Sequence, residues 1–164
     1  AVELKAAVGL SISGFARQHI ISLPRALRKR MLFEEVAQFL DIPGGEQIVA
    51  ESYAQLRKHN CWAVSVVQQY ARFRASRIRS AVIGNAKQFF LLRQSDRRDM
   101  EDLARDIGLP ESAVAAIQRY PLPEQQAPGE RFSSVCYFTP TAQPPQCGTL
   151  RHIQAKEEPC ASAA

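Results

Sequence analysis

Two short apolar runs, each followed by a polar doublet, constrain the fold of this chain more than any other feature. Met31–Phe33 is followed by Glu34-Glu35, and Trp62–Val67 is followed by Gln68-Gln69. Short apolar runs of this kind indicate buried strands. Because helix-length segments separate the runs, we expect an α/β fold with a mostly parallel sheet flanked by helices.

Turn residues and apolar periodicity predict the remaining elements. We expect helices over 1–22, over 46–58, through the arginines to about residue 83, and twice more within 96–120, and further strands over 89–92 and 132–138. Beyond Pro140 the chain holds three more prolines among small residues. The sequence therefore predicts one domain over 1–139, with a small helical insertion at about 96–120, and a poorly ordered tail over 140–164.

Length and composition exclude several classes of protein. The 164 residues suit one domain or a large piece of one, and 46% apolar with 23% charged residues argues against disorder over the whole chain. No apolar run approaches the ~20 residues that span a bilayer. The four cysteines form no C-x-x-C pair, which argues against a zinc site and favours a reducing compartment. The formal net charge of +5 is unevenly spread, with one basic cluster at 25–30 and another at 72–79.

The polar doublets carry the first functional signal, because chemistry in parallel sheets gathers at the carboxyl ends of the strands. An apolar strand that ends in two acids is the layout of a Walker B motif. Glu34 would then hold Mg²⁺ through water, and Glu35 would orient or deprotonate the water that attacks a γ-phosphate. Gln68 would sense that phosphate. The plainer alternatives are a helix start at the acids and a surface amide at Gln68.

One arginine between the two strands is a further candidate. Arg57 could stabilise charge on a phosphate, including that of a nucleotide held by a neighbouring subunit. Its alternative role is a favourable interaction with the dipole at the end of the predicted helix.

Four motifs in order then suggest a family. The chain is similar, over roughly residues 10–140, to the carboxyl-terminal part of the conjugative-transfer ATPases of type IV secretion systems. In that family a strand ends in Asp-Glu, a helix ends in Arg-Lys, a strand ends in Gln, and an Asn precedes the next strand. The matching segments here are Met31–Glu35, Leu56–Asn60, Val66–Gln69, and Gly84-Asn85 before Phe89–Leu92.

The resemblance implies a partial RecA-like P-loop domain that hydrolyses ATP with Mg²⁺. By position, Glu34 takes the place of the metal-holding Asp, Glu35 and Gln68 are catalytic, and Arg57-Lys58 match the Arg-Lys pair. Lys58 and Asn85 would contact the nucleotide. The resemblance also implies a hexamer on the cytoplasmic side of the inner membrane, at a secretion channel whose other subunits would be partners. Contact with DNA would be indirect.

The sequence departs from the family pattern in two places. The first acid is Glu instead of Asp, and no G-x-x-x-x-G-K-[ST] loop occurs in the 164 residues. Without that loop nothing cradles the β- and γ-phosphates. We therefore expect the phosphate-binding half to lie upstream of residue 1, and this chain alone to hydrolyse ATP poorly or not at all.

The alternative function is a DNA-binding module without enzymatic activity. Residues 103–119 read like a helix-turn-helix, although the second helix opens with Glu111 and offers few groups to bases before Gln118 and Arg119. A second route to DNA is non-specific binding by an arginine-rich helix, whose members are Arg72, Arg74, Arg77 and Arg79.

Overall fold

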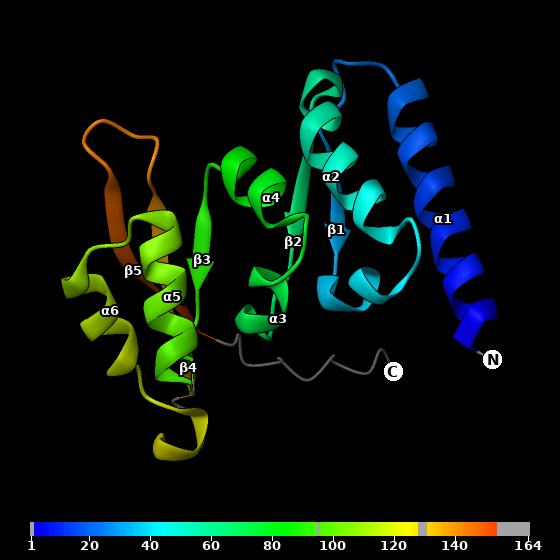
Figure 1. Ribbon diagram of the computed structural model, residues 1–164. Helices are drawn as coiled ribbons and strands as arrows, with labels where there is room; N and C mark the ends of the chain where they lie inside the picture. Colours follow the sequence, from blue (N-terminus) through cyan, green and yellow to red (C-terminus); the bar gives the residue numbers. More distant parts are fainter. Residues whose placement is uncertain (1, 95, 128–130, 154–164) are drawn as a thin grey trace, which may run out of the picture. The chain divides into compact units, whose positions relative to one another are not determined.

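The chain folds into two compact units. The structure, a computed structural model, describes residues 2–94, 96–127 and 131–153 (Figure 1). Unit 1 comprises residues 1–86 and unit 2 comprises residues 87–164. The boundary therefore lies inside the range 1–139, for which the sequence predicts a single domain.

Unit 1 is a parallel strand pair with helices. Its elements are α1 (Val2–Ser22), β1 (Lys29–Phe33), η1 (Val36–Asp41), α2 (Gly45–Gln55), η2 (Leu56–His59), β2 (Cys61–Ser65), α3 (Tyr70–Arg74) and α4 (Arg79–Asn85). The two strands run parallel, with Lys29 opposite Cys61 and Phe33 opposite Ser65. Both predicted strands are thus present, although β2 ends two residues before the apolar run does.

The core of unit 1 lies on one face of this strand pair. Met31 and Phe33 of β1 are buried, whereas Leu32 between them is 60% exposed. Val49 of α2 and Leu56 of η2 have no exposed surface. The alternation along β1 shows that one face of the strand is covered, whereas the apolar run alone predicts two covered faces.

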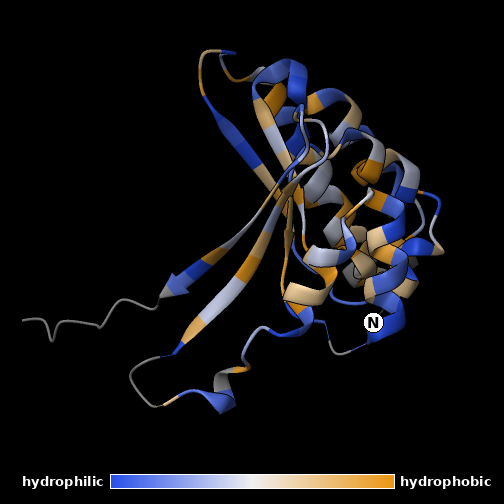
Figure 2. Ribbon diagram, turned by 90° about the vertical axis from the view of Figure 1, so that its left-hand side faces the viewer, coloured by the Kyte–Doolittle hydropathy of each residue, from blue (hydrophilic) through white to orange (hydrophobic). Residues whose placement is uncertain are grey.

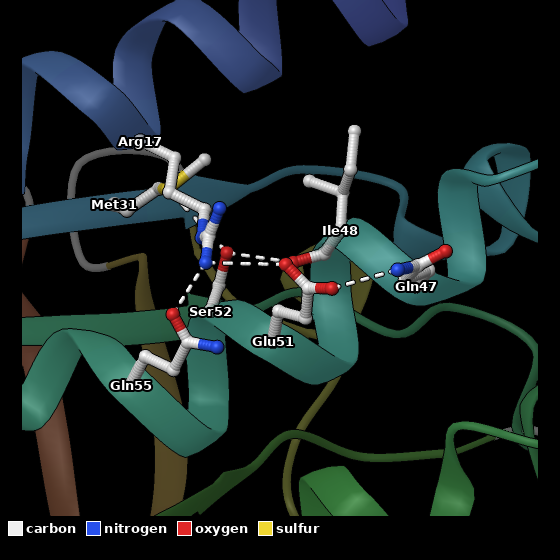
Figure 3. Close-up of polar contacts among 7 residues, drawn as sticks. All are labelled: Arg17, Met31, Gln47, Ile48, Glu51, Ser52 and Gln55. Atoms are coloured by element: carbon white, nitrogen blue, oxygen red, sulfur yellow. Dashed lines mark hydrogen bonds and ion pairs between the residues drawn. The ribbon is translucent and has the colours of Figure 1, made fainter.

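Polar side chains join α1 to α2, as the close-up shows (Figure 3). The Arg17 guanidinium of α1 donates a hydrogen bond to the Gln55 side-chain oxygen and lies 3.1 Å from an Oε of Glu51. Ser52, one turn before Gln55, donates to the Ile48 carbonyl at 2.7 Å. Because the Arg17 side chain is only 15% exposed, this contact is better protected from solvent than a surface ion pair.

The predicted arginine-rich helix is two helices in the structure. α3 ends after Arg74, and α4 begins at Arg79. Between them, the Ser76 hydroxyl donates to the Phe73 carbonyl at 2.6 Å, and the Arg77 N–H donates to the Glu46 carboxylate at 3.3 Å. These bonds satisfy backbone groups outside a helix, and the four arginines therefore do not lie on one continuous helix.

Unit 2 has an antiparallel sheet, which corrects the prediction of a mostly parallel sheet. Its elements are β3 (Phe89–Leu91), α5 (Arg97–Ile107), α6 (Glu111–Gln118), η3 (Pro123–Gln125), β4 (Phe132–Thr139) and β5 (Gln146–Ile153). The strand order is β3-β4-β5, and both pairs are antiparallel. Bands of hydrophobic and hydrophilic residues alternate along the long β4–β5 hairpin (Figure 2). The fold is therefore mixed α/β, with a short parallel pair and a separate antiparallel sheet.

β5 lies within the range 140–164, for which the sequence predicts a poorly ordered tail. Of the prolines that suggest the tail, Pro140, Pro144 and Pro145 occupy the β4–β5 connection, and Pro159 lies outside the described residues. Residues 154–164 lie outside the described residues.

The range 96–120, for which the sequence predicts a small helical insertion, contains the helices α5 and α6. Asp96 caps α5 by accepting hydrogen bonds from the N–H groups of Arg98 and Asp99 at 2.7 and 3.3 Å. Gly108 ends α5 in the left-handed conformation, with φ of 73°, which a residue without a Cβ adopts at little cost.

Candidate active site

The parallel pairing of β1 and β2 brings the two polar doublets to one edge of the sheet. The Val66 N–H donates to the Phe33 carbonyl at 3.0 Å, and the Val36 N–H donates to the Val66 carbonyl at 3.1 Å. These bonds continue the ladder just past both strand ends. The acid doublet lies between Phe33 and Val36, and Gln68 follows Val66 by two residues. We call this end of the sheet, with Glu34, Glu35 and Gln68, the carboxyl edge.

The backbone at Glu35 has an unusual conformation. Its φ of 48° and ψ of 51° place it in the left-handed region, which costs a residue with a Cβ about 1–2 kcal/mol. Glu35 immediately precedes η1, but its side chain makes no capping hydrogen bond to that helix. A helix does start directly after the doublet, as the alternative explanation expects, and the negative charge suits its dipole without a capping bond. Both acids and Gln68 are exposed, so their polar groups are accessible to a ligand.

Arg57 and Lys58 lie at the opposite end of the sheet. Both belong to η2, which precedes β2, and the carbonyl of the next loop residue, Asn60, accepts a hydrogen bond from the N–H of Lys29 at the start of β1. The five residues of β2 separate this end from the carboxyl edge by about 16 Å, at roughly 3.3 Å per residue. On one chain, Arg57 and Lys58 therefore lie at the end of the strand pair opposite Glu35, and their predicted roles at a nucleotide stay predictions. The geometry within one chain does not test the predicted role of Arg57 at a nucleotide held by a neighbouring subunit.

Asn85 is used by its own helix. It is the last residue of α4, and its side-chain amide donates to the Ala81 carbonyl at 2.7 Å. This bond satisfies one of the carbonyls at a helix end, a local role that needs no nucleotide.

The segment of the helix-turn-helix alternative falls on two helices, α5 and α6, and the charges beside their shared groove are of both signs. A groove of about 660 Å³ runs between α5 and α6. Charges of both signs line or flank this groove. Arg97 pairs with Glu101 at 2.7 Å, and Arg105 pairs with Asp102 at 2.8 Å. Such paired arginines are poorly suited to neutralising a phosphate backbone.

Clusters of metal-ligating side chains and membrane-spanning helices are both absent from the described residues. Over 2–94, 96–127 and 131–153, no group of three or more His, Cys, Asp or Glu side chains could hold a metal ion. A Mg²⁺ ion carried by a nucleotide needs only one or two carboxylates beside the phosphates, so Glu34 remains a suitable group. None of the helices in the same ranges combines the length and the apolar character needed to cross a bilayer.

Comparisons with protein-family models, curated proteins and solved structures found no match to this chain.

Proposed function

We propose that unit 1 is the acid-bearing part of a RecA-like ATPase domain of the conjugative-transfer kind. The observation that carries the proposal is the common edge to which β1 and β2 deliver Glu34, Glu35 and Gln68. A parallel pair with acids after one strand and an amide after its neighbour suits a nucleotide whose terminal phosphate lies beyond the strand ends.

The roles follow from the chemistry of the side chains. Glu34 would hold Mg²⁺ through water, and Glu35 would accept a proton from the water that attacks the γ-phosphate. Gln68 can both donate and accept a hydrogen bond, so it can contact this water or a γ-phosphate oxygen. The strained backbone at Glu35 supports its assignment, because conformations of this cost tend to persist where function needs them.

The proposal requires a phosphate-binding loop from another segment. The 164 residues contain no G-x-x-x-x-G-K-[ST], and backbone N–H groups of such a loop normally hold the β- and γ-phosphates. We infer a longer parent protein that supplies this loop upstream. With it we propose the assembly that the resemblance implies, a hexamer at the cytoplasmic side of a secretion channel.

The test compares ATP turnover by the parent protein and two variants. Glu35→Gln keeps the size of the side chain and removes its basicity, and Glu101→Gln makes the same change at an exposed position of unit 2. We expect Glu35→Gln to lower turnover by about 10²- to 10⁴-fold, the usual contribution of a general base, with ATP still bound. Glu101→Gln should leave turnover near the starting value. Unchanged turnover in Glu35→Gln, or turnover by the 164-residue chain alone, would overturn the proposal.

A further inference from the structure

The loops that lead into β1 and β2 come together at the end of the sheet opposite the carboxyl edge. Because the strands are parallel and in register from Lys29 and Cys61, the segments before them share one end. The Lys29 N–H donates to the Asn60 carbonyl at 3.0 Å, which ties the two loops. The Lys29 ammonium turns back onto its own loop and donates to the carbonyls of Leu23 and Pro24 at 3.4 and 3.0 Å.

Five exposed cations lie on the segment before β1, on β1 itself and on η2. They are Arg25, Arg28, Arg30, Arg57 and Lys58. The sequence has no acid over 23–33 or over 52–69. We call the surface formed by these five cations and Trp62 the basic rim. The two basic stretches are about 30 residues apart in the sequence, so only the parallel pairing makes them one surface.

A flat aromatic side chain lies beside the cations. Trp62, the second residue of β2, is 58% exposed and is the only tryptophan of the chain. Arg30 is its register partner on β1, and the Arg30 guanidinium carbon lies 5.5 Å from the centre of the Trp62 ring. An exposed indole that contacts a guanidinium, with further cations nearby, has the composition of surfaces on which unpaired bases stack.

We propose that the basic rim binds single-stranded nucleic acid, with phosphates against the cations and a base stacked on Trp62. An acidic polypeptide would match the charge, but its carboxylate side chains, unlike a base, offer no broad aromatic face to the indole. Duplex DNA keeps its bases inside the stack and presents only phosphates to an exposed ring. This surface lies at the amino end of the strands, about 16 Å of β2 away from the carboxyl edge, and does not depend on the ATPase proposal.

The experiment titrates the 164-residue chain with a single-stranded oligothymidylate and follows tryptophan fluorescence. Because Trp62 is the only tryptophan, stacking on it should quench the signal directly. Each phosphate contact to a single strand contributes about 0.7 to the slope of log K against log salt. Five contacts therefore predict a slope of about −3.5. The double change Arg57→Ala with Lys58→Ala should reduce it to about −2.1.

A matched variant controls for net charge. Lys87→Ala with Arg119→Ala also removes two exposed cations, but from unit 2, and should leave affinity and slope unchanged. Trp62→Ala, followed by the anisotropy of a labelled oligonucleotide, should weaken binding by about 5- to 100-fold for the loss of one stacked base. Circular dichroism spectra matching that of the unchanged chain would confirm that each variant is folded.

Four results would overturn the proposal. They are absence of binding at low salt, equal losses in the two double variants, full affinity in Trp62→Ala, and binding of polyglutamate as tight as that of the oligonucleotide. The last result would identify the rim as a surface for an acidic protein. A fifth result would also overturn it. Displacement of the oligonucleotide by ATP at equal phosphate concentration would indicate that the rim binds a nucleotide triphosphate, such as one held by a neighbouring copy.

Discussion

The left-handed backbone at Glu35 predicts a reversal of the usual stability order of alanine and glycine. Both Glu35→Ala and Glu35→Gly remove the carboxylate and every contact that it makes. They differ only in the Cβ, which at φ of 48° and ψ of 51° is too close to the following carbonyl. A comparison of the two variants therefore isolates the backbone strain from the side chain.

The size of the difference follows from two opposing contributions. Removing the Cβ should relieve about 1–2 kcal/mol of strain. Glycine has more freedom in the unfolded chain, which offsets about 0.5–1 kcal/mol of that gain. We expect Glu35→Gly to be more stable than Glu35→Ala by about 0.5–1 kcal/mol. At the exposed helical position Ala54, the order should be the ordinary one, with Ala54→Gly about 1 kcal/mol less stable than the unchanged chain.

Urea denaturation followed by tryptophan fluorescence would measure both pairs. Trp62 lies in unit 1 with Glu35 and Ala54, so its signal reports the unit that is perturbed. In a unit of this size, 0.5–1 kcal/mol also corresponds to roughly 2–8 °C in melting temperature. If Glu35→Ala proved as stable as Glu35→Gly or more so, the strained turn at the carboxyl edge would be refuted, and with it the backbone argument for a functional Glu35.

Three further predictions concern packing, ion pairs and a thiol. Gly45→Ala should lower the free energy of unfolding by about 1–3 kcal/mol, because the new methyl would overlap a backbone carbonyl, whereas Gly84→Ala adds a methyl in open space and should be neutral or stabilising in the same denaturation assay. Arg17→Ala should cost about 1–3 kcal/mol and Arg97→Ala about 0.5 kcal/mol, because the first ion pair is largely shielded and the second is exposed; equal losses would contradict this reasoning. Burial, and to a lesser extent the neighbouring Cys147 thiol, raises the pKa of Cys136 to about 12. The folded state therefore holds the Cys136 proton more tightly than the unfolded state. Through Cys136, the unfolding free energy should fall as pH rises from about 9 towards 12, by at most about 1.4 kcal/mol per pH unit, and Cys136→Ser should make the measured slope shallower by that contribution.

The carboxyl edge was predictable from sequence because one local rule and one topological rule agree there. Apolar runs with β-branched and aromatic residues mark the strands, and a parallel pairing puts the residues after each strand at the same edge. The same topological rule places Arg57 at the other end, because η2 precedes its strand. The basic rim could have been found in the same way, from two basic stretches that each lead into a strand of one parallel pair.

Other features depend on interactions between distant segments, which local patterns do not encode. The direction of β4 relative to β3 depends on pairing such as Phe90 opposite Tyr137, and an apolar run reads alike in either direction. The break between α3 and α4 depends partly on Glu46, about 30 residues earlier in the chain. β5 has few apolar residues, and its prolines lie in the preceding connection, so composition alone suggests irregular chain.

Among the described residues, β1 and β2 hydrogen-bond in a ladder only with each other, which leaves the outer edge of each strand free. Pairs of strands seldom persist alone, and a bare strand edge is a template for any extended segment that reaches it. If the segment with the phosphate loop adds its own strand there, folding and completion of the nucleotide site would be a single event. If the chain is purified without such a segment, its strand edges should instead pair with those of other copies, and aggregation should rise steeply with protein concentration.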